Sequence, residues 1–381
     1  MLNTYVNGSL IGSEASLNIV PASGIQISGV HDTENKIVHL FFSAIQKFPA
    51  KLVAASDTPE WIKAMADYVC DGVDDQEEIN TALQEASMVV LAPGTYTITD
   101  SILVPSNRVL AGINKTATIV LNGDRSSDIY AITNSDHTNG NSNITIRDLV
   151  IDVNGVADQG GCWEAIYFYY VSNSKLINLT VKNYVSRGIS LLYSHYFKIK
   201  DCELSVPFDI ADYWLPAGIY VSHSSFGHIV GNTFGTPEDV KASIPILLYY
   251  AEKVFIKRNH FFQSYAYSIR ATYDLKDISI KDNWFRGGSG EGDGADPTIY
   301  FYGTSDHPVC DVEISGNRFN AEGLTNMPSY CIIIGSADVY YTMIHGNNFR
   351  NGARTGEVSD SGTGTRMRDN IALDGGWMAD V

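Results

Sequence analysis

The sequence predicts an all-β chain that folds as a parallel β-helix, a solenoid of stacked coils. The pattern Ile-x-x-Asn-x-Phe carries much of this prediction, because it recurs with starts at Ile229, Ile256, Ile280, Ile314 and Ile344. A second apolar alternation follows each copy, as in Ile246/Leu248 and Ile299/Phe301. Its period of two residues is the period of a β-strand. Each repeat therefore contains at least two short strands.

Weaker copies of the pattern extend the series in both directions, with starts at Ile146, Leu176, Ile199 and Met367. Nine copies make eight intervals between positions 146 and 367, or about 28 residues per coil. This length is too short for a βαβ unit, which needs roughly 30 residues or more. A unit that recurs at such a period indicates a solenoid in which each coil pairs with its neighbours.

The repeated asparagines indicate an internal feature of the coils. We expect them to form a hydrogen-bonded ladder at a turn, through Asn232, Asn259, Asn283, Asn317 and Asn347. Cys202 stands at the same repeat position, so we expect it to be a core residue. The chain has five cysteines without metal-ligand spacing, which makes a zinc site an unfavoured interpretation.

The N-terminal part of the chain has a different pattern. Residues 1–55 alternate in short segments and predict a small β module, which could serve virion attachment. Residues 56–88 predict a lead-in segment with helices, and residues 89–381 the β-helix. Pro59 signals the start of a short helix with Trp61, Ala64 and Met65 on one face.

A second helix is expected to cap the open end of the solenoid. Asp75 and Glu78 have the spacing of a capping box, and an apolar stripe follows. The stripe consists of Ile79, Ala82, Leu83 and Ala86. Such a helix protects exposed core and unpaired strand edges from end-to-end aggregation.

Composition excludes several classes of partner. The net charge is −17 and the isoelectric point about 4.8, so no basic footprint for nucleic acid or an anionic membrane is expected. The first nine residues lack a signal peptide pattern, and no stretch approaches the ~20 apolar residues of a membrane span.

The segment that leads into the first coils carries a specific resemblance. Residues 66–75 (ADYVCDGVDD), the predicted helix, then residues 91–96 (LAPGTY) and 108–112 (RVLAG) resemble the start of the pectate-lyase-like superfamily of right-handed β-helices, which includes many phage tailspikes. The resemblance covers about residues 56–375 in architecture. It implies a right-handed parallel β-helix, to which the patterns described above add an N-terminal capping helix and a small N-terminal β module.

The superfamily implies polysaccharide lyases, glycoside hydrolases, epimerases and glycan-binding adhesins. The sequence lacks the polygalacturonase motifs, and the calcium and arginine motifs of pectate lyases are not recognisable. Because one fold hosts many activities, the site must be argued from this chain's own residues.

Tyrosines dominate one predicted outward face of the solenoid. If the second-strand isoleucines stack inward, their neighbours form two outward columns. Substrate-binding candidates in these columns are Tyr167, Tyr169, Tyr220, Tyr249, Arg270, Tyr300 and Tyr302. Aromatic rings suit sugar stacking and tyrosine adds a hydroxyl. Packing of this face against another subunit is an equally weighted alternative.

The longest insertions enter the same face, where loops on a rigid scaffold concentrate function. Asp209 and Asp212, with Glu164 as a further candidate, could supply the carboxylate pair of glycan hydrolysis. Trp214 joins the substrate-binding candidates. Solvated loop acids are the competing interpretation, and Glu164 also suits an ion pair with Arg187.

Three further loop acids form a candidate metal site. Glu291, Asp293 and Asp296 could hold calcium through oxygen ligands, although no EF-hand spacing is present and a flexible loop is the competing interpretation. No cofactor is required by any pattern in the sequence.

Together these features predict a tailspike-like protein that binds, and as a candidate depolymerase cleaves, a host surface polysaccharide. We expect a homotrimer located on a virion tail or outside the cell. A non-catalytic glycan-binding adhesin or structural virion protein is one alternative. A secreted polysaccharide lyase or epimerase is another.

Overall fold

The computed structural model describes residues 50–124, 126–155, 161, 163–205, 217–235, 244–262, 264, 266–286, 296–323 and 327–380, and the backbone of four N-terminal strands. The chain divides into two compact units, Met1–Ala50 and Lys51–Val381. The N-terminal unit contains two antiparallel hairpins. One pairs β1 (Thr4–Val6) with β2 (Ser9–Gly12), and the other pairs β3 (Ile25–Asp32) with β4 (Ile37–Ala44).

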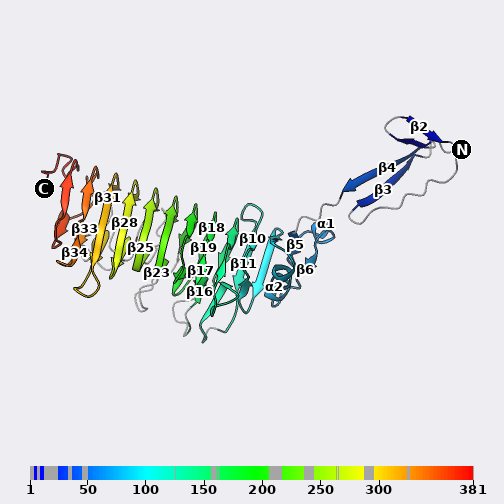
Figure 1. Ribbon diagram of the computed structural model, residues 1–381, viewed down its shortest axis with the longest axis horizontal. Helices are drawn as coiled ribbons and strands as arrows, with labels where there is room; N and C mark the ends of the chain where they lie inside the picture. Colours follow the sequence, from blue (N-terminus) through cyan, green and yellow to red (C-terminus); the bar gives the residue numbers. More distant parts are fainter. Residues whose placement is uncertain are drawn as a thin grey trace. The chain divides into compact units, whose positions relative to one another are not determined.

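The second unit is a parallel β-helix, as the sequence predicts (Figure 1). Its named strands pair in parallel with strands of the coils before and after, and each full coil contributes to three sheets. We call the three sheets sheet 1, sheet 2 and sheet 3. Along each coil the chain passes first through sheet 2, then through sheet 3 and then through sheet 1. At the start of the solenoid, β5 (Ala50–Ala54) pairs with β6 (Tyr68–Val69) and with the first strand of sheet 2.

Sheet 1 contains β9 (Ile102–Val104), β12 (Ile129–Asn134), β16 (Trp163–Tyr169), β20 (Arg187–Leu192), β27 (Ile269–Thr272), β30 (Ile299–Tyr302), β33 (Tyr330–Ile334) and β36 (Gly356–Asp360). Sheet 2 contains β7 (Met88–Leu91), β10 (Val109–Ala111), β14 (Thr145–Arg147), β18 (Lys175–Ile177), β21 (Lys198–Lys200), β28 (Leu275–Lys281), β31 (Val309–Ser315), β35 (Met343–His345) and β37 (Arg366–Arg368). The long strands β23 (Ala217–Val230) and β25 (Ile244–Lys257) run through both sheets.

Sheet 3 contains β8 (Gly94–Ile98), β11 (Ala117–Leu121), β15 (Val150–Asp152), β19 (Thr180–Lys182), β22 (Glu203–Ser205), β24 (Thr233–Phe234), β26 (His260–Phe261), β29 (Trp284–Phe285) and β32 (Arg318–Phe319). Short corner strands between sheets 1 and 2 are β13 (Asn141–Ser142), β17 (Val171–Ser172) and β34 (Val339–Tyr340). The long insertions of the sequence lie between sheet 3 and sheet 1.

The core is a set of columns in which one residue type repeats from coil to coil. In sheet 1, Ile166, Ile189, Ile219 and Ile246 are register partners and are fully buried. In sheet 3, phenylalanine rings stack with centroids 4.6–5.0 Å apart. These rings belong to Phe234, Phe261, Phe285, Phe319 and Phe349. The spacing equals the separation of paired strands, about 4.8 Å.

The predicted asparagine ladder is confirmed. The Nδ2 of Asn259 donates to Oδ1 of Asn283 at 3.0 Å and to the carbonyl of Ile229 at 2.9 Å. The same pattern links the buried asparagines Asn232, Asn259, Asn283, Asn317, Asn347 and Asn370. Cys202 begins this column, since its backbone N–H donates to Oδ1 of Asn232 and its side chain is buried.

The capping helix is confirmed, whereas its capping box is wrong. Helix α2 (Gln76–Glu85) buries Ile79 and Leu83 against the first coils. Asp75 precedes it, but no side chain caps its first turn. The carboxylate of Asp75 instead accepts from the backbone N–H groups of Gly72 and Thr97, at 2.8 and 2.7 Å. Binding these two donors ties the lead-in turn to β8.

The first helix is shorter than its sequence pattern predicts. Helix α1 (Glu60–Lys63) is a single turn and buries no residue. Trp61 and Met65 are 68% and 62% exposed, so the predicted apolar face does not pack on the solenoid. One turn is too short to present a continuous stripe.

Candidate functional site

The predicted outward columns of sheet 1 have the expected register. Tyr167 pairs with Ser190, and Ser190 with Tyr220. Farther along the stack, Arg270 pairs with Tyr300. The tyrosines and Arg270 are partly exposed. Ser190 is buried, because it donates to the buried carboxylate of Glu164 at 2.5 Å.

The second outward column contains Tyr169, Tyr249 and Tyr302, also partly exposed. Ser222 and Thr272, which separate them along the stack, are buried. The register confirms the predicted outward column, since Ser222 pairs with Tyr249 and Thr272 pairs with Tyr302. Within it the tyrosines reach solvent, whereas the small polar residues between them are buried.

A third aromatic column was missed by the sequence pattern, and it lies at the corner just after sheet 1. It consists of Tyr170, Tyr193, His223, Tyr250 and Tyr273. All five have left-handed backbone torsions, with φ between 50° and 62°. Their rings stack at 5.0, 4.7 and 4.5 Å over the first four members. Because each residue directly follows a predicted strand, the repeat spacing carried the signal that could have identified this column.

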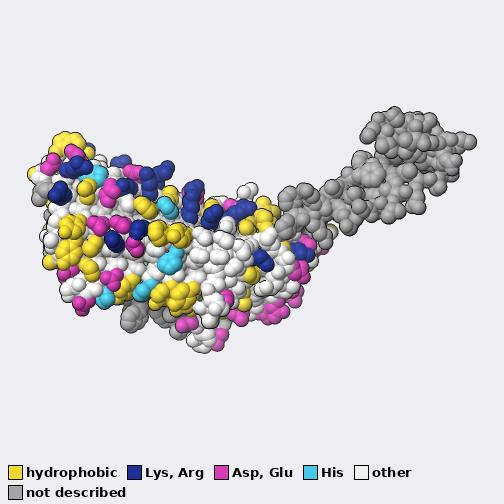
Figure 2. All heavy atoms as spheres, in the orientation of Figure 1, with side chains coloured by type: hydrophobic (Ala, Val, Ile, Leu, Met, Phe, Trp, Pro, Cys, Tyr) yellow, Lys and Arg dark blue, Asp and Glu magenta, His cyan; other side chains and the backbone are white. Residues whose placement is uncertain are grey.

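The three columns merge into one network of ring contacts, here called the aromatic band. It comprises Tyr130, His137, Tyr167, Tyr169, Tyr170, Tyr193, His223, Tyr249, Tyr250, Tyr267, Tyr273, Tyr300, Tyr302 and His307. Every member is at least partly exposed. Figure 2 shows a row of Lys and Arg side chains along one long edge of the solenoid, while apolar side chains form patches over the rest of the face in view. The band therefore offers an extended surface that follows the stacking direction.

Three tyrosines of the band hold their hydroxyl protons more tightly than usual, because their pKa is raised. Burial raises the pKa of Tyr167, Tyr249 and Tyr267 to about 12. A protonated hydroxyl both donates and accepts a hydrogen bond. The band can thus contact a ligand through ring faces and through hydroxyl groups.

Two arginines accompany the rings of this face. The guanidinium of Arg270 lies 5.5 Å from the Tyr267 centroid, and its buried Nε has no hydrogen-bond partner among the described residues. The guanidinium of Arg187 lies 4.0 Å from the centroid of Tyr220 and 3.4 Å from the carboxylate of Glu164.

Glu164 has the geometry of a structural ion-pair partner. It is only 3% exposed, and burial raises the pKa of its carboxyl, an effect that Arg187 and Ser190 oppose. Its oxygens are occupied by Arg187, Ser186 and Ser190. The structure therefore favours the ion-pair interpretation of Glu164.

Several other predicted site residues cannot be placed. Asp209, Asp212, Trp214, Glu291 and Asp293 lie outside the described residues. Their predicted roles in cleavage, stacking and calcium binding stay predictions.

Asp296, the remaining calcium candidate, is partly buried. Its backbone carbonyl accepts from the N–H of Ser329 at 3.0 Å. In the described part of the chain, the group with metal-like geometry is instead Cys70, Asp75 and Glu78. The bonds of Asp75 to Gly72 and Thr97 and the cysteine thiol give this group no resemblance to an oxygen-ligand calcium site.

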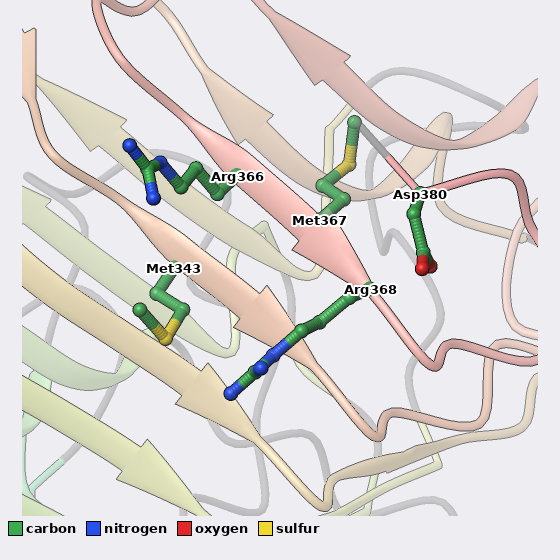
Figure 3. Close-up of a pocket in the computed structure, with 5 residues that line it drawn as sticks. All are labelled: Met343, Arg366, Met367, Arg368 and Asp380. Atoms are coloured by element: carbon green, nitrogen blue, oxygen red, sulfur yellow. The ribbon is translucent and has the colours of Figure 1, made fainter.

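A surface hollow of about 360 Å³ lies at the C-terminal coil (Figure 3). It is lined by Met343, Arg366, Met367, Arg368 and Asp380. Arg366 and Arg368 project from one side of β37 and Met367 from the other (Figure 3). The lining combines the exposed Met343 and the partly buried Met367 with side chains of opposite charge, and none of these residues belongs to the aromatic band.

The family model described as "right handed beta helix region" matches residues 164–349. The chain is a right-handed parallel β-helix. A surface adhesin of Streptococcus pneumoniae, PfbA, aligns over 78% of this β-helix chain and 87% of its own, with 14% identity and a TM-score of 0.54. No curated protein matches the sequence significantly.

The tailspike of Escherichia coli bacteriophage HK620 aligns with a TM-score of 0.57 and 14% identity, over 78% of this β-helix and 56% of the tailspike. A form of that tailspike in complex with a pentasaccharide gives 0.53 and 15%, over 72% and 53%. The chain thus spans about half of the tailspike's length. These likenesses confirm the pectate-lyase-like fold that the lead-in segment resembles.

Proposed function

We propose that the aromatic band binds a polysaccharide at a cell surface, in a tailspike-like or adhesin-like role. The observation that carries this proposal is the continuous network of fourteen partly exposed rings along the stack. Successive coils lie about 4.8 Å apart, so the band repeats similar contacts along a line. A polysaccharide is itself a linear repeat and suits such a surface.

The chemistry of the band fits sugar rings. The faces of aromatic side chains supply apolar contact area, and tyrosine hydroxyls supply hydrogen bonds at low entropic cost. The unpartnered Nε of Arg270 adds a donor beside Tyr267. A protein-binding face would also use tyrosines and arginines, so subunit contact is the competing explanation.

The fold comparisons support the proposal without deciding it. A phage tailspike in complex with a pentasaccharide and a pneumococcal surface adhesin share this architecture. Location on a virion or outside the cell, and assembly as a homotrimer, belong to the same proposal. In the described part of the chain, no helix has the length and apolar character needed to cross a membrane.

Cleavage of the bound glycan is a second candidate function, and one contact favours it. Nδ1 of His307 lies 2.7 Å from Oδ2 of Asp274, and the imidazole packs edge-on against Tyr250. An imidazole oriented by a carboxylate can transfer protons near neutral pH. The pair lies on the aromatic band, where a bound chain would meet it.

The test uses glycine substitutions at two band positions. Tyr193→Gly with Tyr250→Gly removes two rings from the corner column, and glycine accepts their left-handed torsions. Tyr341→Gly is the matched control, because Tyr341 has the same kind of torsion and is 67% exposed outside the band. We expect the double variant to bind a recognised polysaccharide at least about tenfold more weakly, and the control to bind normally.

A panel of bacterial surface polysaccharides identifies the ligand, with chain length, reducing ends and unsaturated uronate absorbance as cleavage readouts. His307→Ala should abolish cleavage and retain binding if the second function holds. Wild-type binding by the double variant would contradict the proposal. Light scattering that shows an oligomer dissociating in the double variant would favour subunit contact instead.

A further inference from the structure

A second array of ligand-like side chains lies on sheet 3, in the later coils. Strands β26, β29 and β32 alternate buried phenylalanines with the outward residues His260, Trp284 and Arg318. These outward residues are register partners, and Asn348 extends the row through its bridge to Arg318. Two residues after each member lies a second row, formed by Phe262, Arg286, Asn320 and Arg350.

The charge of this array is opposite to that of the chain. Its eight positions contain three arginines and no carboxylate, although the chain carries a net charge of −17. Neither Arg318 nor Arg350 forms an ion pair with any residue that the structure describes. In a strongly acidic protein, guanidinium groups on adjacent coils that have no ion-pair partner among the described residues favour an anionic ligand.

These side chains border a surface hollow of about 310 Å³. Its lining residues are Arg318, Asn320, Glu322, Asn348, Arg350 and Asn351. The volume falls at the lower end of small-molecule sites, roughly 300–1,000 Å³. The one carboxylate of the lining, Glu322, accepts from Nδ2 of Asn351 at 3.2 Å. The three asparagines add hydrogen-bonding groups of the kind that sugar hydroxyls need.

An exposed indole adjoins the hollow. Trp284 is 38% exposed, and its ring stacks on His260 with centroids 4.0 Å apart. The guanidinium of Arg318 lies 5.7 Å from the Trp284 centroid. His260 therefore supports the indole from one coil while Arg318 continues the surface to the next. The indole is thus held between His260 and Arg318, and its exposed part offers a rigid apolar contact beside the hollow.

We propose that this hollow binds one residue of an acidic sugar, a pyranose that bears a carboxylate. Its carboxylate would pair with the Arg318 and Arg350 guanidinium groups, whose planar forks match carboxylates. Its hydroxyls would meet Asn320, Asn348 and Asn351, and its ring would lie toward Trp284. Glu322 disfavours a dianion such as phosphate, because a second negative charge on the ligand increases repulsion. This site uses no residue of the aromatic band and stands independently of it.

The test is a titration of the full chain with sodium glucuronate at constant ionic strength of about 0.15 M. Binding is followed by saturation-transfer NMR and by tryptophan fluorescence. Glucose and inorganic phosphate are the comparison ligands. We expect glucuronate to bind saturably. Glucose and phosphate should bind at least about tenfold more weakly, because glucose lacks the carboxylate and phosphate lacks the sugar ring with its hydroxyls.

Arg318→Gln with Arg350→Gln should weaken glucuronate binding at least about tenfold, because two charge-assisted contacts are lost. Arg366→Gln with Arg368→Gln is the matched control, since these arginines line the other hollow (Figure 3). Trp284→Phe should remove the fluorescence change and reduce affinity. Melting curves for each variant check folding, and Arg318→Gln alone serves if the double variant unfolds.

Three results would overturn the proposal. Glucose could bind as tightly as glucuronate, which would remove the role of the arginines. Phosphate could bind as tightly with the same arginine dependence, which would show a simple anion site. Glucuronate binding could also be absent in the wild type, or unchanged in the arginine variants.

Discussion

Two columns of aromatic rings run along the solenoid. We call the phenylalanines inside sheet 3 the interior ladder and the column at the corner after sheet 1 the exterior ladder. Inside sheet 3, phenylalanines stack at 4.6–5.0 Å and are fully buried. At the corner after sheet 1, Tyr170, Tyr193, His223 and Tyr250 stack at 4.5–5.0 Å, and all four reach solvent. The coil spacing sets ring separation in both. Burial decides whether the rings stabilise the fold or remain available to a ligand.

The interior ladder should give the largest loss of stability. Phe285→Ala removes a buried ring that stacks on Phe261 and Phe319. We expect the free energy of unfolding to fall by about 3–5 kcal/mol, from lost burial and the cavity left behind. Denaturant unfolding measures this, with Tyr341→Ala as an exposed control. A loss below about 1 kcal/mol would contradict the stabilising role of the interior ladder.

The asparagine ladder should come next. Asn283→Ala removes the acceptor of the buried backbone N–H of Asn259 and the Nδ2 donor to the carbonyl of Ile256, while Nδ2 of Asn259 keeps its bond to the carbonyl of Ile229. An unsatisfied buried group costs about 1–3 kcal/mol, so we expect a loss on the order of 3 kcal/mol. The same unfolding measurement applies. Asn320→Ala, at a partly exposed position just after β32 in the next coil, should change stability little in comparison.

Glu164 should make stability depend on pH. Burial raises the pKa of its carboxyl above the ordinary value of 4.5. A raised folded-state pKa means that this group stabilises the fold most below pH 4.5, and that the contribution is lost as pH rises through the folded-state value.

Comparison with Glu164→Gln isolates this contribution. The melting temperature of the wild type, relative to that of the variant, should fall as pH increases from 4 to 7, in roughly the range where carboxyls titrate. A relative increase would mean that Arg187 and Ser190 outweigh burial and lower the pKa.

The exterior ladder should give the smallest change in stability. Tyr250→Gly removes an exposed ring and also relieves a left-handed torsion, with φ of 52°. The relieved torsion offsets part of the loss from four ring contacts, each on the order of 1 kcal/mol. We expect the free energy of unfolding to fall by about 2 kcal/mol, less than for either buried ladder. A loss as large as that of Phe285→Ala would remove the distinction between the two ladders.

Much of the fold could be predicted from the sequence, because the repeat in the sequence reflects the repeating strands and turns of the coils. Strand alternation, the buried isoleucine columns and the asparagine ladder each depend on local periodicity, and the structure confirms them. A prediction that depended on one particular side-chain partner, the capping box of Asp75, was wrong. The carboxylate of Asp75 bonds to Gly72 and Thr97 instead of capping α2, because β8, far along the chain, presents a backbone donor to it.

The candidate sites show the same division. The sequence by itself determined a solenoid with a tyrosine-rich outward face, since alternation assigns every second residue to the surface. It did not identify the corner column of Tyr193, His223 and Tyr250, whose residues lie outside regular alternation in left-handed turns.

Only the tertiary structure decided which side chains from different coils meet. Neighbours in the asparagine ladder are separated by 23 to 34 residues, so constant spacing cannot assign partners. Register between coils is fixed by interior packing and backbone pairing. That register brings Arg318 beside Asn348 and near Arg350, and it joins fourteen rings into one band. The repeat specifies the scaffold, while the register of its coils specifies the surfaces that can bind.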